Sequence, residues 1–312
     1  MKVAVVAFGG NALMGHEGKS SYVDQMRRTD TICRNLLSLF DLGYRIVITH
    51  GNGPQVGNIL MQQECLMDSL PPMPLDVCNA MTQGQIGYMI EQRLRNIFAE
   101  RKIKKSVVVF LTQVVVSEND PAFKNPTKFI GPFFKKDDIE KLKKEEGWHT
   151  KEDSGRGYRR IVASPRPVDI VEKEEIADMA NRDLVVVACG GGGIPVLRDK
   201  KGNLKGVAAV IDKDYAAERL ASLIGADSLI LITPVDKVSI FYGSSKQKDL
   251  GRISVAEAKR YYDEGHFPPG SMGPKIEAAI KFISSGGNRT IITSIDGLDD
   301  AIRCKGGTVI TQ

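Results

Sequence analysis

The chain has 312 residues, of which 42% are hydrophobic and 26% are charged, and its formal net charge at pH 7 is +5. This composition is ordinary for a globular protein, and so mild a charge without a recognisable binding module predicts no nucleic-acid partner. The five cysteines form no CxxC pair and no apolar run approaches the roughly 20 residues of a membrane span, so we expect a cytoplasmic protein without a zinc site, disulfides or membrane contact.

In the first half of the chain, short apolar runs alternate with helical patterns. Continuous apolar, largely β-branched residues are typical of strands that are buried on both faces. The continuous apolar run at 3–7 and the β-branched run at 46–49 predict strands, and a further strand is predicted at 107–116. Apolar residues recur at helical spacing in three further segments, the first of which ends before Gly43. These patterns predict helices at 29–40, 54–68 and 75–100.

The composition changes at residues 117–167, which are rich in Lys, Pro and Gly. So long a connection inside a compact fold is usually functional, and we interpret it as an inserted lid. After it the alternation resumes, with strands predicted at 184–188, 207–211, 228–232, 290–293 and 308–311. Helices are predicted at 172–180, 215–224, 253–264 and after 270–275. The alternation predicts a three-layer αβα sandwich with a mainly parallel central sheet.

Glycine turns follow three of the predicted strands. The strand at 46–49 leads into His50-Gly51-Asn52-Gly53, and Pro54 suits the first turn of a helix because it lacks an N–H group. The same device recurs at Gly9-Gly10-Asn11 and at 190–193. Glycine permits close approach of the backbone, and the free N–H groups of a helix start bind anions. The sequence therefore predicts an anion site at the carboxyl edge of the sheet.

Motifs of several common enzyme classes are absent. The chain has no Walker A sequence, protein-kinase signature, HExxH or GxSxG, and GNGPQVG spaces its last glycine one residue too far for GxGxxG. His50 is interpreted as a hydrogen-bonding residue of its turn rather than a general base.

Lysines at strand ends and helix starts are the remaining candidates for chemistry. Lys213 is either a solvated surface residue or a group that binds a polyanion, and its neighbour Asp214 can be explained as the N-cap of the helix that follows. Lys275 follows Pro274 at a helix start, where a cation opposes the helix dipole unless a polyanion binds there. Lys128 lies on the predicted lid. Convergent lysines and N–H groups suit phosphoryl transfer, and the lack of an evident base favours a carboxylate-type acceptor.

Nine motifs distributed over the chain together resemble those of one family. They are AFGGNAL (7–13), THGNGPQVGN (49–58), PLDVCNAMTQGQIGY (74–88), LTQVVV (111–116), KNPTKFIGPF (124–133), DSGRGYRRIVASPRP (153–167), CGGGGIPV (189–196), AVIDKDYAAERLA (209–221) and PGSMGPKIEAAI (269–280). On these motifs the chain resembles the carbamate kinases, which have the amino-acid kinase fold. The resemblance covers essentially the whole sequence.

The resemblance implies reversible phosphoryl transfer between ATP and carbamate, giving ADP and carbamoyl phosphate. It implies a single domain, 1–312, whose lobe 1–180 holds carbamate and carries the lid 117–167, and whose lobe 181–312 holds the nucleotide. It also implies Mg²⁺ bound by phosphates and water rather than by protein side chains, small-molecule substrates, a homodimer, and ATP synthesis as the last step of arginine fermentation by the arginine deiminase pathway.

The resemblance also implies roles for individual residues. The turns Gly9-Gly10-Asn11 and Gly51-Asn52-Gly53 would hold the phosphoryl group, the second turn also holding carbamate. Lys213 and Lys275 would straddle the phosphates and Asp214 would orient both lysines. Lys128 would reach the phosphoryl group from the lid. The nucleotide would lie at Thr233, Asp236, Ser271 and Met272.

Two alternative functions remain open from the sequence. The first is another enzyme of the same fold, acting on a larger carboxylate or a phosphate monoester. Relatives that act on acetylglutamate or aspartate have lysine where this chain has Ala7, which counts against amino-acid acceptors. The second is a catalytically inactive sensor of nucleotide or carbamoyl phosphate, which the presence of every candidate lysine disfavours.

Overall fold

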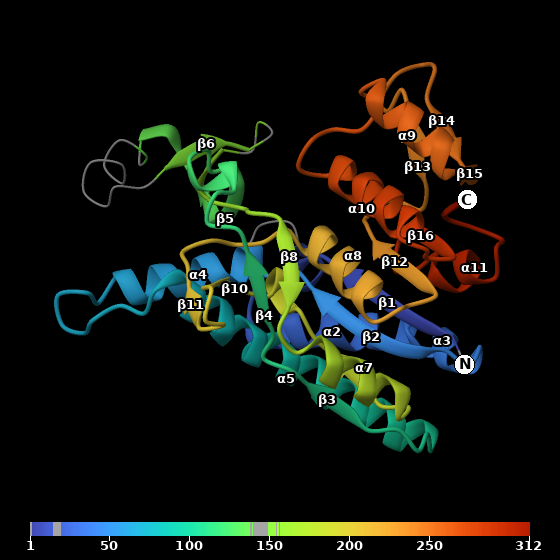
Figure 1. Cartoon of the computed structure of the whole chain (residues 1–312), viewed down its shortest axis with the longest axis horizontal. Helices are drawn as coiled ribbons and strands as arrows, with labels where there is room; N and C mark the ends of the chain where they lie inside the picture. Colours follow the sequence, from blue (N-terminus) through green and yellow to red (C-terminus); the bar gives the residue numbers. More distant parts are fainter. Residues whose placement is uncertain (1, 15–19, 138, 140–148, 154, 156) are drawn as a thin grey trace.

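Eight strands form the central sheet, in the order β15-β17-β16-β12-β1-β2-β9-β3 (Figure 1). The computed structural model describes residues 2–14, 20–137, 139, 149–153, 155 and 157–312. The strands are β1 (Val3–Phe8), β2 (Arg45–His50), β3 (Val107–Val109), β9 (Val185–Val187), β12 (Ser228–Ile232), β15 (Arg252–Ser254), β16 (Arg289–Thr293) and β17 (Thr308–Thr311). Neighbours run parallel except for the antiparallel pair β16–β17. The predicted mainly parallel sheet is confirmed.

Helices cover both faces of this sheet. In β1, Val5 and Ala7 pack into one hydrophobic core while Val6 and Phe8 pack into the other, because successive strand side chains point to opposite faces. The first core contains side chains of α7 (Lys173–Asn181), α8 (Lys213–Leu223), α9 (Val255–Asp263) and α10 (Met272–Ser284). The second contains side chains of α1 (Gly10–Met14), α2 (Tyr22–Asn35), α3 (Leu37–Asp41), α5 (Leu75–Arg101) and α11 (Leu298–Ile302). These are the three predicted layers.

Three smaller sheets accompany the central one (Figure 1). A four-stranded sheet contains β11 (Leu204–Gly206), β10 (Ile194–Arg198), β4 (Gln113–Val116) and β8 (Pro167–Ile170). The predicted lid carries a three-stranded sheet of β5 (Lys128–Phe134), β7 (Tyr158–Val162) and β6 (Thr150–Glu152), preceded by the 3-10 turn η1 (Pro121–Phe123). β13 (Val238–Ile240) and β14 (Lys248–Leu250) form a hairpin. In the lid, residues 138, 140–148, 154 and 156 lie outside the described residues.

Two sequence predictions were wrong. Residues 107–116 form two strands, β3 and β4, in different sheets, because the Gln83 amide binds both backbone groups of Thr112 between them. The segment 207–211 forms no strand and contains a bend at Ala208. Its Ala209 carbonyl accepts a hydrogen bond from Asn79 Nδ2 at 2.9 Å, and its Val207 and Val210 N–H groups donate to the carbonyls of Pro195 and Ala163, so its backbone hydrogen bonds go to scattered partners and no ladder forms. In addition, the helix predicted at 29–40 is divided at Leu36 into α2 and α3.

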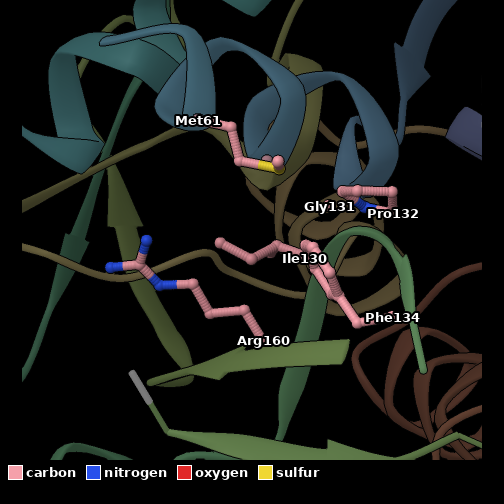
Figure 2. Close-up of a pocket in the computed structure, with 7 residues that line it drawn as sticks. Met61, Ile130, Gly131, Pro132, Phe134 and Arg160 are labelled. Carbon is pink, nitrogen blue, oxygen red and sulfur yellow. The ribbon is translucent and has the colours of Figure 1, made fainter. Parts of the chain in front are cut away.

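The helix α4 (Gly53–Glu64) contacts the lid backbone to backbone. A Cβ atom on Gly57 would lie 2.0 Å from the nitrogen and 2.1 Å from the Cα of Gly131 in β5. Beside this contact is a small pocket lined by Gly57, Met61, Ile130, Gly131, Pro132, Phe134 and Arg160 (Figure 2). In the described part of the chain, no helix combines the length and apolar character needed to cross a membrane.

The substitution Gly57→Ala is expected to lower the free energy of unfolding by about 1–3 kcal/mol, because β5 must move away from α4. Gly84→Ala in α5 is the matched control, since a Cβ atom there meets nothing within 4 Å. The control is expected to be neutral or to stabilise by about 0.5–1 kcal/mol, because alanine favours a helix over glycine. Urea unfolding of both variants measures the difference, and equal midpoints would contradict the close contact.

Candidate active site

Two glycine turns meet at the carboxyl ends of β1 and β2. Phe8 pairs with His50 in the sheet, so the residues that follow each strand lie side by side. A Cβ atom on Gly10 would lie 2.9 Å from the Gly51 carbonyl oxygen, and one on Gly51 would lie 2.9 Å from the Gly10 nitrogen. Glycine is therefore required at both positions, because any side chain would separate the two turns.

Both turns leave backbone donors available. Within the described ranges, no acceptor is found for the N–H groups of Gly9, Gly10, Asn52 and Gly53. Such N–H groups at the ends of strands and the starts of helices form a binding place for an anion. Of the predicted phosphoryl-binding residues, Asn11 lies in α1, and its side chain is outside the described residues.

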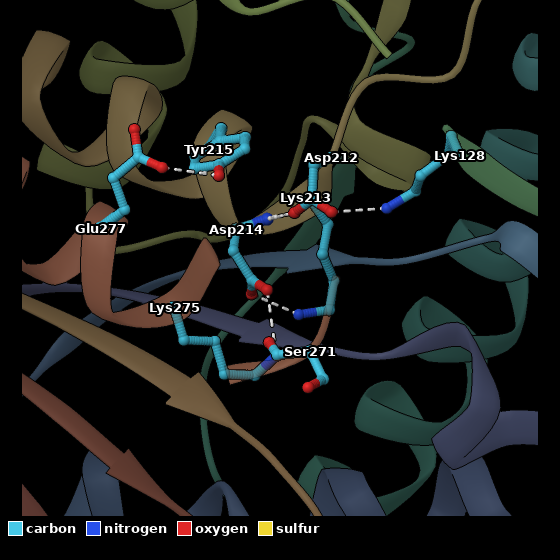
Figure 3. A network of polar contacts seen from close by, with 8 residues as sticks. All are labelled: Lys128, Asp212, Lys213, Asp214, Tyr215, Ser271, Lys275 and Glu277. Carbon is cyan, nitrogen blue, oxygen red and sulfur yellow. Dashed lines mark hydrogen bonds and ion pairs between the residues drawn. The ribbon is translucent and has the colours of Figure 1, made fainter. Parts of the chain in front are cut away.

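Two lysines and one carboxylate meet beside these turns (Figure 3). Lys213 and Asp214 begin α8, and Lys275 lies on the first turn of α10. The Lys213 ammonium donates to Asp214 Oδ1, and Lys275 Nζ lies 3.0 Å from Asp214 Oδ2. A Cβ atom on Gly51 would lie 3.1 Å from Lys213 Cδ, so this lysine passes directly over the second glycine turn.

The charged groups of Lys213, Asp214 and Lys275 have little exposure to solvent. Burial lowers the pKa of Lys213. Burial also opposes ionisation of Asp214, but Lys213 and Lys275 outweigh it and hold the pKa of that carboxyl below its usual value. For Lys275 the attraction of Asp214 outweighs burial and raises the pKa. Two ammonium groups and one carboxylate leave a surplus of positive charge, which favours an anionic ligand.

Lys128 reaches the same place from the lid. Lys128 begins β5, and its Nζ lies 2.5 Å from Asp212 Oδ2 (Figure 3). The other oxygen of Asp212 accepts a hydrogen bond from the Asp214 N–H at 2.9 Å. The N-cap of α8 is therefore Asp212, and the interpretation of Asp214 as the N-cap was wrong. Burial opposes ionisation of Asp212, but Lys128 and Lys213 hold its pKa well below the usual range.

Polar side chains of α5 bind the second glycine turn and two further backbone segments near the site. Asn52 Nδ2 donates to Asn79 Oδ1 at 2.9 Å and to Thr82 Oγ1 at 2.8 Å, so its amide hydrogens point toward α5. Asn79 in turn binds the segment that leads to Asp212, and Gln83 Nε2 donates to the Gly190 carbonyl in η2 (Gly190–Gly192) at 2.9 Å. All four side chains are buried. No role was predicted for these α5 residues, although Asn79, Thr82 and Gln83 share one face of a helix at i, i+3 and i+4.

The residues predicted at the nucleotide are divided between two places. Ser271 is the N-cap of α10, and its carbonyl accepts a hydrogen bond from Lys275 at 3.3 Å. Met272 follows it and packs against the first core. Thr233 directly follows β12, at the same sheet edge as Gly9, because β1 and β12 are parallel neighbours. The Asp236 carboxylate accepts a hydrogen bond from the Ser294 hydroxyl, and no contact in the described part of the chain joins it to the lysines.

His50 is buried behind the second turn. Its Nδ1 lies 3.2 Å from the Gly51 carbonyl oxygen, and Nε2 has no partner among the described residues. Burial is the main cause that lowers the pKa of His50, to about 4. The imidazole is therefore neutral at physiological pH and donates from Nδ1, which is the hydrogen-bonding role expected for this residue.

Stability is expected to depend on His50 between pH 6.5 and 4. The unfolded chain binds a proton near pH 6.5, whereas the folded protein does so only near pH 4, so stability falls as the pH is lowered through this window. The slope from this residue approaches about 1.4 kcal/mol per pH unit. Urea unfolding at pH 7.5, 6 and 5 measures it, and His50→Gln, which retains a donor but does not titrate, should show a flatter profile. Parallel profiles would contradict the prediction.

Comparisons with known proteins identify the family of the chain. Residues 2–294 match the amino acid kinase family. The chain is 46% identical over 309 residues to a carbamate kinase of Pyrococcus horikoshii, covering 98% of each protein, and 46% identical over 316 residues to one of Clostridium perfringens, covering 100% of each. A structure of carbamate kinase from Giardia lamblia bound to AMP-PNP has a TM-score of 0.91 and 39% identity, covering 99% of this chain and 98% of that chain. The chain therefore belongs to the carbamate kinases of the amino acid kinase family.

Proposed function

We propose that this protein transfers a phosphoryl group reversibly between ATP and carbamate, giving ADP and carbamoyl phosphate. The observation that carries the proposal is the meeting of Lys213 and Lys275 at Asp214, beside two glycine turns with available N–H groups. The full-length similarity to carbamate kinases supports the choice of carbamate as acceptor.

The reaction needs charge stabilisation more than proton transfer. A carboxylate oxygen of carbamate attacks the γ-phosphorus of ATP, and the bond from that phosphorus to the β–γ bridging oxygen breaks. Both the attacking and the leaving oxygen are anionic, so no proton moves and no general base is required. The N–H groups of the two turns hold the phosphoryl oxygens, while Lys213 and Lys275 neutralise the charge that spreads over them. Asp214 keeps the two ammonium groups in place.

Mg²⁺ enters this scheme as part of the nucleotide substrate. Asp212 and Asp214, the carboxylates beside the lysines, are each bound to an ammonium group. We therefore expect the ion to be held by phosphate oxygens and water. In the described ranges, no group of three or more His, Cys, Asp or Glu side chains is placed to hold a metal ion.

Several finer expectations belong to the same proposal. Residues 1–180 would hold carbamate and residues 181–312 the nucleotide, with Thr233, Asp236, Ser271 and Met272 nearest to it. We expect a cytoplasmic homodimer that forms ATP from carbamoyl phosphate as the last step of arginine fermentation.

The decisive experiment mixes the purified protein with carbamoyl phosphate and MgADP and follows ATP formation. ATP should form without any other substrate. No ATP at saturating concentrations would remove the proposal, and a screen of larger carboxylates and phosphate monoesters would then identify a different acceptor. Tight binding of carbamoyl phosphate without turnover would instead indicate a sensor.

Replacing Lys128 with alanine is expected to lower kcat by up to about 10²-fold, the lower end of the loss seen when one preorganised charge stabiliser is removed. The effect is smaller than for an unpaired cation because Asp212 already neutralises part of the Lys128 charge. Lys151→Ala, at an exposed lysine of the same small sheet, is the matched control. If Lys128→Ala changed only the thermal midpoint, the lid would have no part in transfer.

A further inference from the structure

Gln55 places an unpaired oxygen at the junction of the two glycine turns. It lies on the first turn of α4 and is 2% exposed. Its Nε2 donates to the Gly10 carbonyl at 3.3 Å, and the amide is assigned the orientation that makes this hydrogen bond. The buried Oε1 then has no hydrogen-bond partner in the part of the chain that the structure describes.

Gln55 Oε1 lies near a second hydrogen-bond acceptor, the Gly51 carbonyl oxygen. A Cβ atom on Gly10 would lie 2.9 Å both from Gln55 Oε1 and from the Gly51 carbonyl oxygen, so the two acceptors flank the same side of Gly10. On Gly51, the corresponding Cβ atom would meet Lys213 Cδ, which belongs to the donor side. The site thus presents cations and N–H groups beside carbonyl oxygens, and suits a ligand that is anionic at one end and carries N–H groups at the other.

On the proposed function, the substrates have this character. Carbamate and carbamoyl phosphate both carry an NH₂ group next to the oxygen that bonds to phosphorus. We infer that Gln55 Oε1 accepts a hydrogen bond from this NH₂ group and makes the site selective for carbamoyl phosphate over acyl phosphates that lack N–H groups. Gln55 is in this sense a specificity-determining residue of the carbamate site.

The physical basis is the penalty for an unmade hydrogen bond. An acceptor shielded from water forms a strong bond with a bound donor and is expensive to leave unpaired when the ligand has none. Acetyl phosphate places a methyl group where carbamoyl phosphate has NH₂ and is otherwise nearly the same size. Sites built to bind a substrate N–H reject analogues that lack it by about 10⁴-fold or more in favourable cases.

The experiment compares carbamoyl phosphate and acetyl phosphate as phosphoryl donors to MgADP. For Gln55→Met, which has similar length but no acceptor, kcat/KM for carbamoyl phosphate should fall by roughly 10–100-fold. For acetyl phosphate it should stay unchanged or rise, so the ratio of kcat/KM for carbamoyl phosphate to that for acetyl phosphate falls by at least the same factor. Gln55→Glu keeps oxygen acceptors at the position, and both rates should fall through charge repulsion while the ratio is retained.

Gln85→Met, at an exposed glutamine of α5, is the matched control and should leave both rates unchanged. Unfolding midpoints of every variant verify the fold, and if Gln55→Met does not fold, the ratio in Gln55→Glu decides. An unchanged ratio in Gln55→Met, a parallel loss for both donors, or a collapsed ratio in Gln55→Glu would overturn the inference. A wild-type protein that forms no ATP from carbamoyl phosphate would overturn the proposed function instead.

Discussion

Replacing Lys213 with alanine is expected to lower kcat for ATP formation by about 10²–10³-fold, the loss typical of removing one preorganised charge stabiliser. The Lys213 ammonium is buried, bound to Asp214, and its stem passes over Gly51, so no mobile surface lysine can replace it. The same loss is expected for Lys275→Ala. Asp214 retains one partner in either variant, so the fold should persist.

Lys205→Ala, at an exposed lysine of β11, is the control for loss of positive charge and should keep full activity. Steady-state kinetics in both directions separate kcat from KM. Because the two lysines act on the same transferred group, the double variant should lose less than the product of the single losses. An undiminished rate in Lys213→Ala would mean that this lysine does not contact the reacting phosphoryl group.

Replacing Asp214 with alanine is expected to lower the free energy of unfolding by about 3–5 kcal/mol, because two buried ammonium groups lose their shared counter-charge. The Asp214 side chain is 5% exposed, and those of Lys213 and Lys275 are each 12% exposed, so water cannot replace it. A bound polyanion can supply part of the negative charge that the missing carboxylate provided. Saturating MgADP should therefore raise the unfolding midpoint of Asp214→Ala more than that of the wild type.

Asp178→Asn is the matched control, since Asp178 pairs with Arg182 on an exposed face of α7. Removing such a surface pair should change stability by about 0–1 kcal/mol. Urea unfolding with and without MgADP measures both variants. If Asp214→Ala were as stable as Asp178→Asn, the lysines would not depend on this carboxylate.

The strands and turns at the carboxyl edge of the central sheet could be predicted, because the sequence patterns that indicate them involve residues close together in the chain. The strand at 3–7 is a continuous apolar run, those at 46–49 and 228–232 are mostly apolar, and glycines follow the first two. Lys275 stood out because a cation at a helix start is unfavourable without an anion. The catalytic roles of these residues stay predictions, although the structure places Lys213 and Lys275 on one carboxylate.

The elements that were mispredicted depend on side chains far away in the chain. The runs at 107–116 and 207–211 have the composition of buried strands, and composition is nearly the same for any buried extended segment. Gln83 interrupts the first run from 29 residues away, and Asn79 binds the second from 130 residues away. The residues within either segment do not indicate that a side-chain amide of another element will bind its backbone.

By itself, the sequence determined the alternation of strands and helices, the glycine turns that end β1 and β2, and the resemblance to the carbamate kinases. Only the tertiary structure decided that Asp212 caps α8 and binds Lys128, and that Gln55 Oε1, beside Gly10, has no partner among the residues that the structure describes. The physical reason is the separation along the chain over which each effect acts. Propensity and periodicity act between near neighbours in the chain, whereas an ion pair such as Lys128–Asp212 joins residues 84 positions apart and forms only after both segments have packed.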